Sequence, residues 1–130
     1  MIVVDASVLA PALGDDAGDG DRARGRLHGE RLAAPGLIYL EVGSVWRRQV
    51  ATGRLSARRA GLALDDLAAL PLRQTSHVRL LPRCWELREN VSIYDAAYVA
   101  LAEALGVTLL TADKRLARAP SPSCSIELIR

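Results

Sequence analysis

Apolar residues along the chain occur either in short continuous runs or at helical spacing. The runs at residues 1–4 and 107–110 have the pattern of strands buried on both faces. Shorter strands are expected at 33–35, 72–76 and 126–129. Apolar residues spaced by three or four predict helices over 6–13, 22–32, 37–51, 57–70, 79–89, 93–105 and 113–119. Strands that alternate with helices in this way predict an α/β protein with a parallel sheet.

Gly, Pro and Ser residues mark the ends of several of these elements. The Gly- and Asp-rich residues 14–21 predict a loop. Ser56 is expected to cap the helix over 57–70, and Pro71 to end it. The helix over 93–105 is apolar nearly all round, which predicts a buried helix, and Gly106 is expected to end it in the left-handed conformation.

Length and composition limit the classes of protein to which the chain can belong. Its 130 residues, half of them apolar and a quarter charged, are typical of one globular domain. Cys84 and Cys124 form no Cys-x-x-Cys motif, so the sequence offers no zinc or redox site. Two thiols behind an N-terminus without a secretory signal predict a reducing, cytoplasmic location. No apolar stretch is long enough to predict a membrane span.

Four acidic residues stand where chemistry is expected. Asp5 and Asp113 each follow a predicted strand, Asp95 opens the most apolar helix, and Glu41 lies between apolar neighbours. Ligands of α/β sheets bind at the carboxyl ends of the strands, so these groups can share one crevice. Clustered carboxylates need a cation or bound protons, and oxygen ligands without Cys or His select Mg²⁺ or Mn²⁺. Such a site suits the hydrolysis of a phosphodiester bond.

Each Asp residue also has a purely structural interpretation, which the sequence leaves open. Asp5 and Asp113 precede predicted helices and can be their N-caps. Ser92 and Asp95 have the spacing of a capping box. Glu41 has no capping role, so the structural interpretation is weakest there.

Four blocks of the chain together resemble the PIN domain, and more closely the VapC-type toxins of bacterial toxin–antitoxin pairs. The blocks are residues 2–9 (IVVDASVL), Leu40-Glu41, residues 94–102 (YDAAYVALA) and residues 110–116 (LTADKRL). The resemblance extends over the chain as a single PIN domain. It implies a PIN-like α/β/α sandwich, with a short, mostly parallel sheet of four to five strands flanked by helices.

The resemblance also implies an activity and its residues. It implies an endoribonuclease that depends on Mg²⁺ or Mn²⁺ and inhibits translation, with Asp5, Glu41, Asp95 and Asp113 as catalytic residues and the three Asp residues as metal ligands. It further implies a homodimer and a VapB-like antitoxin whose C-terminal segment blocks the site.

The hydroxyls of Ser7 and Thr111 match positions that support the first and last carboxylates in the family, although a local turn or cap is an equal alternative. One departure is Ser44, where many relatives carry Asn, which leaves open how Glu41 is positioned. Arg47, Arg48, Lys114 and Arg115 are candidate RNA contacts, with ordinary solvated surface as the alternative. The closely spaced residues Arg22, Arg24 and Arg26 are expected to form a solvated helix face or an antitoxin contact.

Two further expectations concern the apolar surface. Trp46 and Trp85 are expected in the core or a dimer interface. The antitoxin is expected to cover apolar side chains around Leu32, Leu37 and Trp46, while one of its cations reaches towards the acidic residues.

Other functions fit the sequence less well. A metal-independent ribonuclease needs paired acid–base groups, and nothing brings His28 and His77 together. A phosphatase with Asp5 as nucleophile would carry a second Asp where Ser7 stands. A non-catalytic PIN-like RNA-binding module would be expected to have lost some of the four acidic residues.

Overall fold

Five short strands form one parallel sheet in the order β3-β2-β1-β4-β5 in the computed structural model, which describes all 130 residues. The central pair aligns Val3 with Leu109 and Val4 with Leu110. The sheet confirms the predicted fold class, and all of its pairings are parallel. The strands are β1 (Ile2–Val4), β2 (Leu32–Ala33), β3 (Leu72–Arg73), β4 (Leu109–Thr111) and β5 (Ile126–Leu128).

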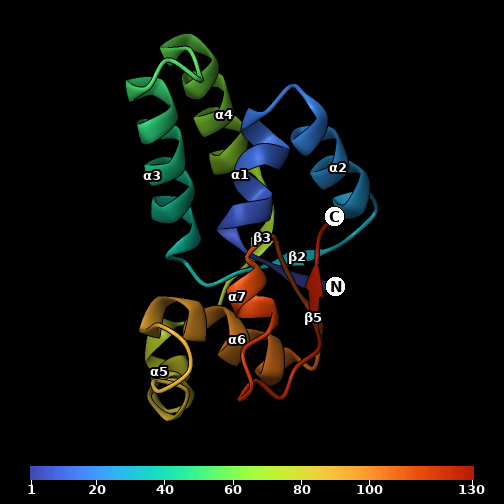
Figure 1. Ribbon diagram of the computed structural model, residues 1–130, viewed down its shortest axis with the longest axis vertical. Helices are drawn as coiled ribbons and strands as arrows, with labels where there is room; N and C mark the ends of the chain where they lie inside the picture. Colours follow the sequence, from blue (N-terminus) through green and yellow to red (C-terminus); the bar gives the residue numbers. More distant parts are fainter.

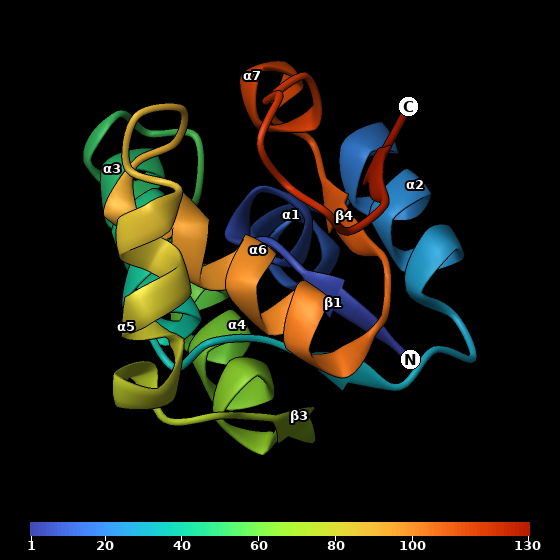
Figure 2. The same ribbon diagram turned by 90° about the horizontal axis from the view of Figure 1, so that it is seen from below.

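Helices cover both faces of this sheet (Figures 1 and 2). On one face, α1 is surrounded by α2, α3 and α4, whereas α5 and α6 pack together on the other face. The sheet grows from β1 in one direction through β2 and β3, and then in the other through β4 and β5. Right-handed crossovers require helices on both faces for such an order. The helices are α1 (Ala6–Gly14), α2 (Gly18–Leu27), α3 (Ile38–Ala51), α4 (Ala57–Ala69), α5 (His77–Glu86), α6 (Ile93–Leu105) and α7 (Lys114–Ala117).

The order of the strands reverses between β1 and β4, and both are completely buried. In α/β sheets this reversal opens a crevice at the carboxyl ends of the strands. The predicted buried helix is confirmed as α6, in which every residue from Ala96 to Ala102 is buried. Gly106 ends α6 at a φ of 67°, as expected. The helix α6 packs between the sheet and α5. This packing fixes the first turn of α6, which carries Asp95, beside the crevice.

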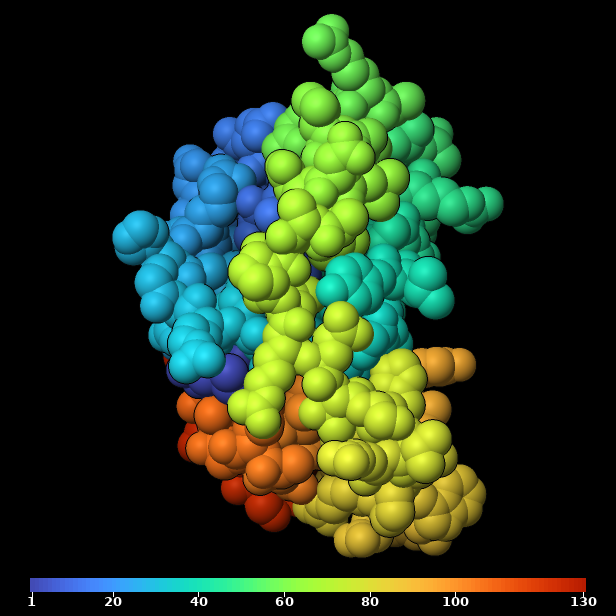
Figure 3. All heavy atoms as spheres, turned by 180° about the vertical axis from the view of Figure 1, so that it is seen from behind, coloured from blue at the N-terminus to red at the C-terminus, as the bar shows by residue number.

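Trp46 anchors α3 to α1. Its side chain is 2% exposed, and its indole Nε1–H donates to the Ala10 carbonyl at 3.2 Å. Gly14 makes the close approach possible, since a Cβ there would lie 2.5 Å from the indole nitrogen. Of the two places expected for Trp46, the core is confirmed, whereas the expectation that the antitoxin covers Trp46 is wrong, because its ring is already buried within the chain. On the back of the molecule, α4 lies between α3 and the α1–α2 side (Figure 3).

The segment that follows α1 differs from its prediction. Residues 14–21 were expected to be a loop, but α2 begins at Gly18 and the link is only three residues long. Gly20 N–H donates to Asp15 Oδ2, and a Cβ at Gly20 would collide with the Asp15 carbonyl. The tight turn therefore needs glycine, and local composition alone could not show that a helix follows at once. Likewise, α2 ends at Leu27, so Leu32 lies in β2 and not in a helix.

Arginine side chains tie the outer elements together. Arg24 donates to the Ala12 and Asp15 carbonyls at the end of α1, and Arg26 binds Glu127 of β5 through two nitrogens. Arg24 is exposed and Arg26 partly so, as expected of a solvated helix face, but both also bind other elements of the chain, which the sequence did not predict. Separately, no helix has the length and apolar character that a membrane span requires.

Glu103 of α6 joins α5 to the C-terminal segment. Its carboxylate accepts from Arg83 Nε and Nη2 at 2.7 and 3.1 Å, and from the Ser123 N–H at 2.6 Å. The hydrogen bonds from Arg83 are the main reason that the pKa of Glu103 is lowered. This carboxylate is 15% exposed, so its ionised form stabilises the native chain.

We expect Glu103→Gln to lower the free energy of unfolding at pH 7 by about 1–2 kcal/mol, because the ion pair with Arg83 is lost. The folded-state pKa of Glu103 is lowered. Its stabilisation is therefore full above the unfolded pKa, about 4.3, and disappears as the pH falls through the folded value. Urea unfolding from pH 3 to pH 7 measures the difference. Glu89→Gln, at an exposed position without an ion pair, is the matched control, and an equal loss there would contradict the assignment.

Candidate active site

Asp5 lies at the end of β1 and is only 7% exposed. Its backbone N–H continues the sheet by donating to the Leu110 carbonyl. The hydroxyls of Ser7 and Thr111 both donate to Asp5 Oδ2 at 2.7 Å. The second oxygen, Oδ1, accepts no hydrogen bond. Since no buried side-chain oxygen of the chain lacks a hydrogen-bond partner, Oδ1 must be accessible to solvent, and it therefore faces the crevice. The capping alternative for Asp5 is wrong, since its side chain makes no cap on α1.

The same two hydroxyls order the end of β4. Ser7 Oγ accepts the Ala112 N–H at 2.9 Å, and Thr111 Oγ1 accepts the Asp113 N–H at 3.0 Å. Asp113 Oδ1 in turn caps α7 by accepting from the backbone of Arg115 and Leu116. The capping interpretation of Asp113 is therefore correct for one oxygen, and its other oxygen remains free.

Glu41 reaches the site from α3 and is positioned by Tyr98 of α6. The Tyr98 hydroxyl donates to Glu41 Oε1 at 2.5 Å, while Tyr98 itself is fully buried. Burial raises the pKa of Glu41, the Tyr98 hydrogen bond opposes this, and the charges of Asp5 and Asp95 raise it further. This contact answers what Ser44 left open: Ser44 is exposed and makes no hydrogen bond to Glu41.

Tyr98 was missed as a site residue, although it stands in the quoted block YDAAYVALA. A buried tyrosine in an apolar helix reads as core. Only its spacing from Asp95 could have pointed to Tyr98, because residues three apart are neighbours on one side of a helix.

Asp95 lies in the first turn of α6, where the Ser92 hydroxyl caps the helix by accepting the Asp95 N–H. The Ser92 half of the expected capping box is thus confirmed. The pKa of Asp95 is raised, first by burial and then by the charges of Asp5 and Asp113, whereas the charge of Arg115 lowers it. The structure therefore places Asp95 within electrostatic range of Asp5, Asp113 and Glu41, and Asp5 within range of Glu41.

These charges are poorly compensated. Asp5, Glu41 and Asp95 take part in no ion pair, and Asp113 has only Arg115 at 3.9 Å. Like charges that are half-buried without counterions are costly, so the site favours a bound cation or bound protons.

The donor atoms are those of a site for a hard cation. Asp5 Oδ1, the free oxygen of Asp113 and the Asp95 carboxylate are available, and no Cys or His is among them. The side chains do not form a preassembled cage, since no three Asp, Glu, His or Cys residues are close enough to hold an ion as they stand. The residues fit Mg²⁺ or Mn²⁺ in chemistry and charge, and a bound ion would draw them together.

The cationic candidates surround this site unequally. Arg115 is exposed and lies nearest, beside Asp113. Arg48 is seven residues from Glu41 along α3, hence on the same face and about 10 Å farther along the axis. Arg47 and Lys114 are exposed without ion pairs. The two histidines are not brought together, since His28 ends α2 and His77 accepts the Leu37 N–H at the start of α5.

The profile of the PIN-domain family matches residues 2–122. Ribonuclease VapC1 of Mycobacterium tuberculosis is 44% identical over 129 residues, which cover 98% of this chain and 97% of the relative. The chain belongs to the PIN-domain family, within its VapC group. A second relative, Ribonuclease VapC9 of Mycobacterium tuberculosis, is 42% identical over 99% of this PIN domain and 98% of its own length.

Solved structures show the same fold as this PIN domain. VapBC2 from Rickettsia felis, bound to a DNA fragment from its promoter, matches with a TM-score of 0.70 at 16% identity and full coverage of both chains. VapC20 of Mycobacterium tuberculosis, described as a sarcin–ricin loop cleaving toxin, matches with a TM-score of 0.68 at 18% identity, covering 90% of this chain and 93% of that one. The predicted α/β/α sandwich is thereby confirmed.

We expect Asp95→Asn to stabilise the metal-free protein, by on the order of 1 kcal/mol, because it removes one of the repelling charges. Mg²⁺ should then raise the melting temperature of the wild type by binding the native state, and should raise that of Asp95→Asn far less. Thermal melts in chelator and in Mg²⁺ measure both effects. Asp65→Asn, at an exposed position on α4, is the control. A variant less stable than wild type in chelator would favour the capping interpretation.

Proposed function

We propose that this chain is a metal-dependent endoribonuclease toxin of the VapC type, neutralised by a VapB-like antitoxin. The observation that carries the proposal is the convergence of Asp5, Glu41, Asp95 and Asp113 at the β1–β4 crevice, in a chain 42–44% identical to proteins named as VapC ribonucleases. The alternatives are weaker, because a non-catalytic module would not be expected to keep all four acids. Asp5 also lacks the second Asp that a phosphatase nucleophile would have.

Asp5, Asp95 and Asp113 would hold Mg²⁺ or Mn²⁺, and Ser7 and Thr111 orient Asp5 for this task. When bound, the ion would supply charge stabilisation at the phosphate and make water a stronger nucleophile. The hydroxyls occupy Asp5 Oδ2 and leave Oδ1 towards the crevice, so this ligand is oriented before any ion arrives.

Glu41 is the residue best placed to take a proton. Tyr98 occupies Oε1 and fixes the carboxylate, so Oε2 remains able to accept a proton from the attacking water. Its raised pKa, caused mainly by burial, makes it a stronger base than an exposed carboxylate. The water oxygen bonds to phosphorus, the bond from phosphorus to O3′ breaks, and O3′ takes a proton from solvent. Cationic side chains, among them Arg48 and Arg115, with Arg47 and Lys114 as further candidates, would bind neighbouring phosphates.

The purified protein is expected to cleave RNA in Mg²⁺ or Mn²⁺ and to stop in chelator. The products should carry 5′-phosphate and 3′-hydroxyl ends, since water and not the 2′-hydroxyl attacks. End-specific ligation of the products and sequencing of the ends detect this, with total cellular RNA as substrate. Asp5→Asn should lower the rate at least about 100-fold, and Asp65→Asn should leave it unchanged. Cyclic 2′,3′-phosphate ends, or full activity in chelator, would exclude the mechanism.

Tyr98→Phe should lower kcat about tenfold while changing KM little, because the variant loses only the hydrogen bond that orients Glu41. That hydrogen bond lowers the pKa of Glu41, so its loss should move the acid limb of the pH–rate profile to higher pH. Rates from pH 5 to pH 9 measure the displacement. A drop in rate with an unmoved profile would show that Tyr98 is only part of the core.

We further propose that the protein forms a homodimer through the apolar surface at the ends of α3, α5 and α6. The exposed side chains of this surface are large. A groove lined by Leu37, Leu81, Ile93 and Tyr94 connects the three helices. The patch begins directly beside Glu41 and Asp95, so the two sites of a dimer would face a common opening. Its exposed members are Leu40, Val78, Leu81, Trp85, Ile93 and Tyr94. Trp85 is 63% exposed, so of its two expected places the core is excluded and the interface remains.

The antitoxin is proposed to insert a cationic side chain among Asp5, Asp95 and Asp113, because these charges have so few partners in the chain itself. Leu37 lines the groove that is proposed to form the dimer interface, so the antitoxin would contact it only at the edge of that interface. Leu32 pairs with Ile2 at the amino end of the sheet, at the opposite end from the acidic residues. Co-expression with the small protein encoded beside the toxin should therefore give an inactive complex.

Leu81→Glu should convert the dimer into a monomer, because a carboxylate on the shared apolar surface would have to be desolvated. Light scattering after gel filtration, at several protein concentrations, measures the mass. Leu62→Glu is the matched control, because Leu62 lies on α4, away from this surface, and is 53% exposed, compared with 52% for Leu81. A wild type that stays monomeric, or a monomer from both variants, would reject this interface.

A further inference from the structure

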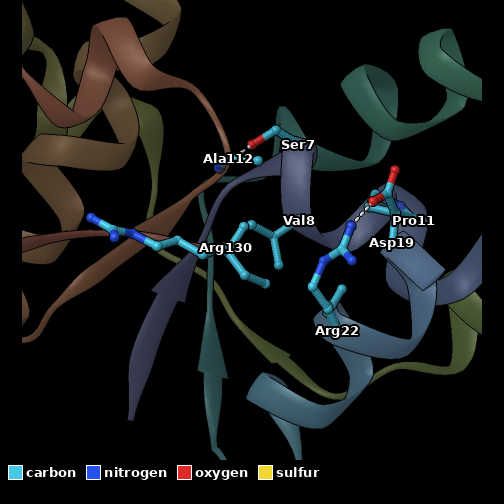
Figure 4. Close-up of a pocket in the computed structure, with 9 residues that line it drawn as sticks. Ser7, Val8, Pro11, Asp19, Arg22, Ala112 and Arg130 are labelled. Atoms are coloured by element: carbon cyan, nitrogen blue, oxygen red, sulfur yellow. Dashed lines mark hydrogen bonds and ion pairs between the residues drawn. The ribbon is translucent and has the colours of Figure 1, made fainter.

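A separate pocket of about 210 Å³ adjoins the acidic site through Ser7 and Ala112, and Figure 4 shows the residues that line it. The two share a wall made of Ser7 and Ala112. Ser7 Oγ donates to Asp5 on the side of the acidic site, and it accepts the Ala112 N–H at the edge of the pocket. A molecule bound in the pocket would therefore lie next to whatever occupies the acidic site.

The floor of the pocket is apolar. Its apolar lining consists of Val8 and Ala23, which are buried, and of Pro11 and Ile129, which are partly exposed. The volume is below the roughly 300–1,000 Å³ of pockets for drug-sized ligands, so it suits one small ring system. The chain has few aromatic residues on which a base could stack, so an apolar slot is the alternative way to bind one.

One cation stands over the opening. Arg22 of α2 lines the pocket, and its one hydrogen-bond and ion-pair partner is Asp19, which is on the same helix and 74% exposed. Figure 4 shows the contact between the Arg22 guanidinium and Asp19, and the Arg130 side chain extending away from both. The neighbouring Arg24 and Arg26 are committed to carbonyls of α1 and to Glu127. Arg22 is therefore the member of the run that can exchange its partner for a phosphate.

We propose that this pocket is a subsite for the base of an RNA nucleotide next to the bond that is cut, with Arg22 binding that nucleotide's phosphate. The inference rests on the proposed function for its biological meaning. The apolar floor would take the ring, the cation would take the anion, and the shared Ser7–Ala112 wall would place the next phosphate at the acidic residues.

Nucleotide binding can be measured without cleavage. The protein in chelator is titrated with each of the four ribonucleoside 5′-monophosphates, and with inorganic phosphate, while methyl and amide NMR signals are followed. At least one nucleotide should shift the signals of Ile129, Val8 and Ala23 in a saturable manner. Inorganic phosphate should shift those of Arg22 alone. If no nucleotide shifts the floor residues, or if phosphate shifts them equally, the base subsite is rejected.

Variants test each half of the pocket. Arg22→Ala should weaken nucleotide binding about fivefold or more and reduce its dependence on salt, as the loss of one phosphate contact does. Asp19→Asn should tighten binding in the wild type but not in the Arg22→Ala background, because it acts by freeing Arg22. Ile129→Trp should fill the slot and abolish the shifts at Val8 and Ala23. Arg58→Ala, an exposed arginine on α4, is the control.

Cleavage kinetics separate this inference from the proposed function. With an RNA that the wild type cuts, Ile129→Trp should raise KM at least about fivefold and leave kcat within about twofold. If the wild type cuts no RNA but binds nucleotides in the pocket, the proposed function fails, while the pocket stands as a nucleotide-binding site. If the wild type cuts RNA and the variants behave as wild type, the subsite fails alone. Shifts produced only by a peptide from the antitoxin would assign the pocket to that partner and overturn the proposal.

Discussion

The parallel pairing of β1 with β4 places two carboxylates at the same end of the sheet, and the remainder of the site is built around their repulsion. Asp5 and Asp113 leave the ends of these strands, while Ser7 and Thr111 hold both strand ends through hydroxyl hydrogen bonds. These hydroxyls neutralise no charge, but they fix where the charges lie. Neutral hydroxyl groups thus set the positions of the carboxylates, whereas the positive charge that would balance these carboxylates has to come from a bound ligand.

The supporting helices extend the same arrangement. Burial of α6 between the sheet and α5 brings Asp95 and Tyr98 to the crevice, and Trp46 fixes α3 so that Glu41 can meet Tyr98. The pKa values of Glu41 and Asp95 are raised by burial and by the neighbouring carboxylates, as expected where like charges lie close together without counterions. A protein that keeps such a site in spite of this repulsion is one in which the charges serve a ligand.

The surfaces around the acidic site differ in character, which suits different occupants. The ends of α3, α5 and α6 expose large apolar side chains, typical of contact with another protein. On the other side, α1 and α2 enclose a small slot beneath Arg22. Because both regions border the same carboxylates, dimerisation, substrate binding and inhibition are all able to influence one another there.

Several features followed from the sequence because their causes are local. Continuous β-branched runs predict buried strands, and the rule that ligands bind at strand ends then predicts that Asp5 and Asp113 meet. Gly106 and Ser56 were correct as helix ends since capping depends on nearest neighbours. Glu41 was suspected because a carboxylate among apolar neighbours has no local use. The resemblance to PIN domains united these residues into one site.

Only the tertiary structure could decide which side chains from distant elements touch. The Tyr98–Glu41 hydrogen bond spans 57 residues, and the Trp46–Ala10 contact spans 36. Neither pairing leaves a local pattern, so Tyr98 was overlooked, and Trp46 could not be assigned to the core rather than to an interface. The immediate start of α2 depends on the packing of Gly20 against Asp15. Likewise, only the tertiary structure shows that Arg24 and Arg26 bind α1 and β5, whereas Arg22 binds only Asp19 of its own helix. Local chemistry determines where helices, strands and reactive groups occur, whereas packing between distant segments determines which of those groups remain available to a ligand.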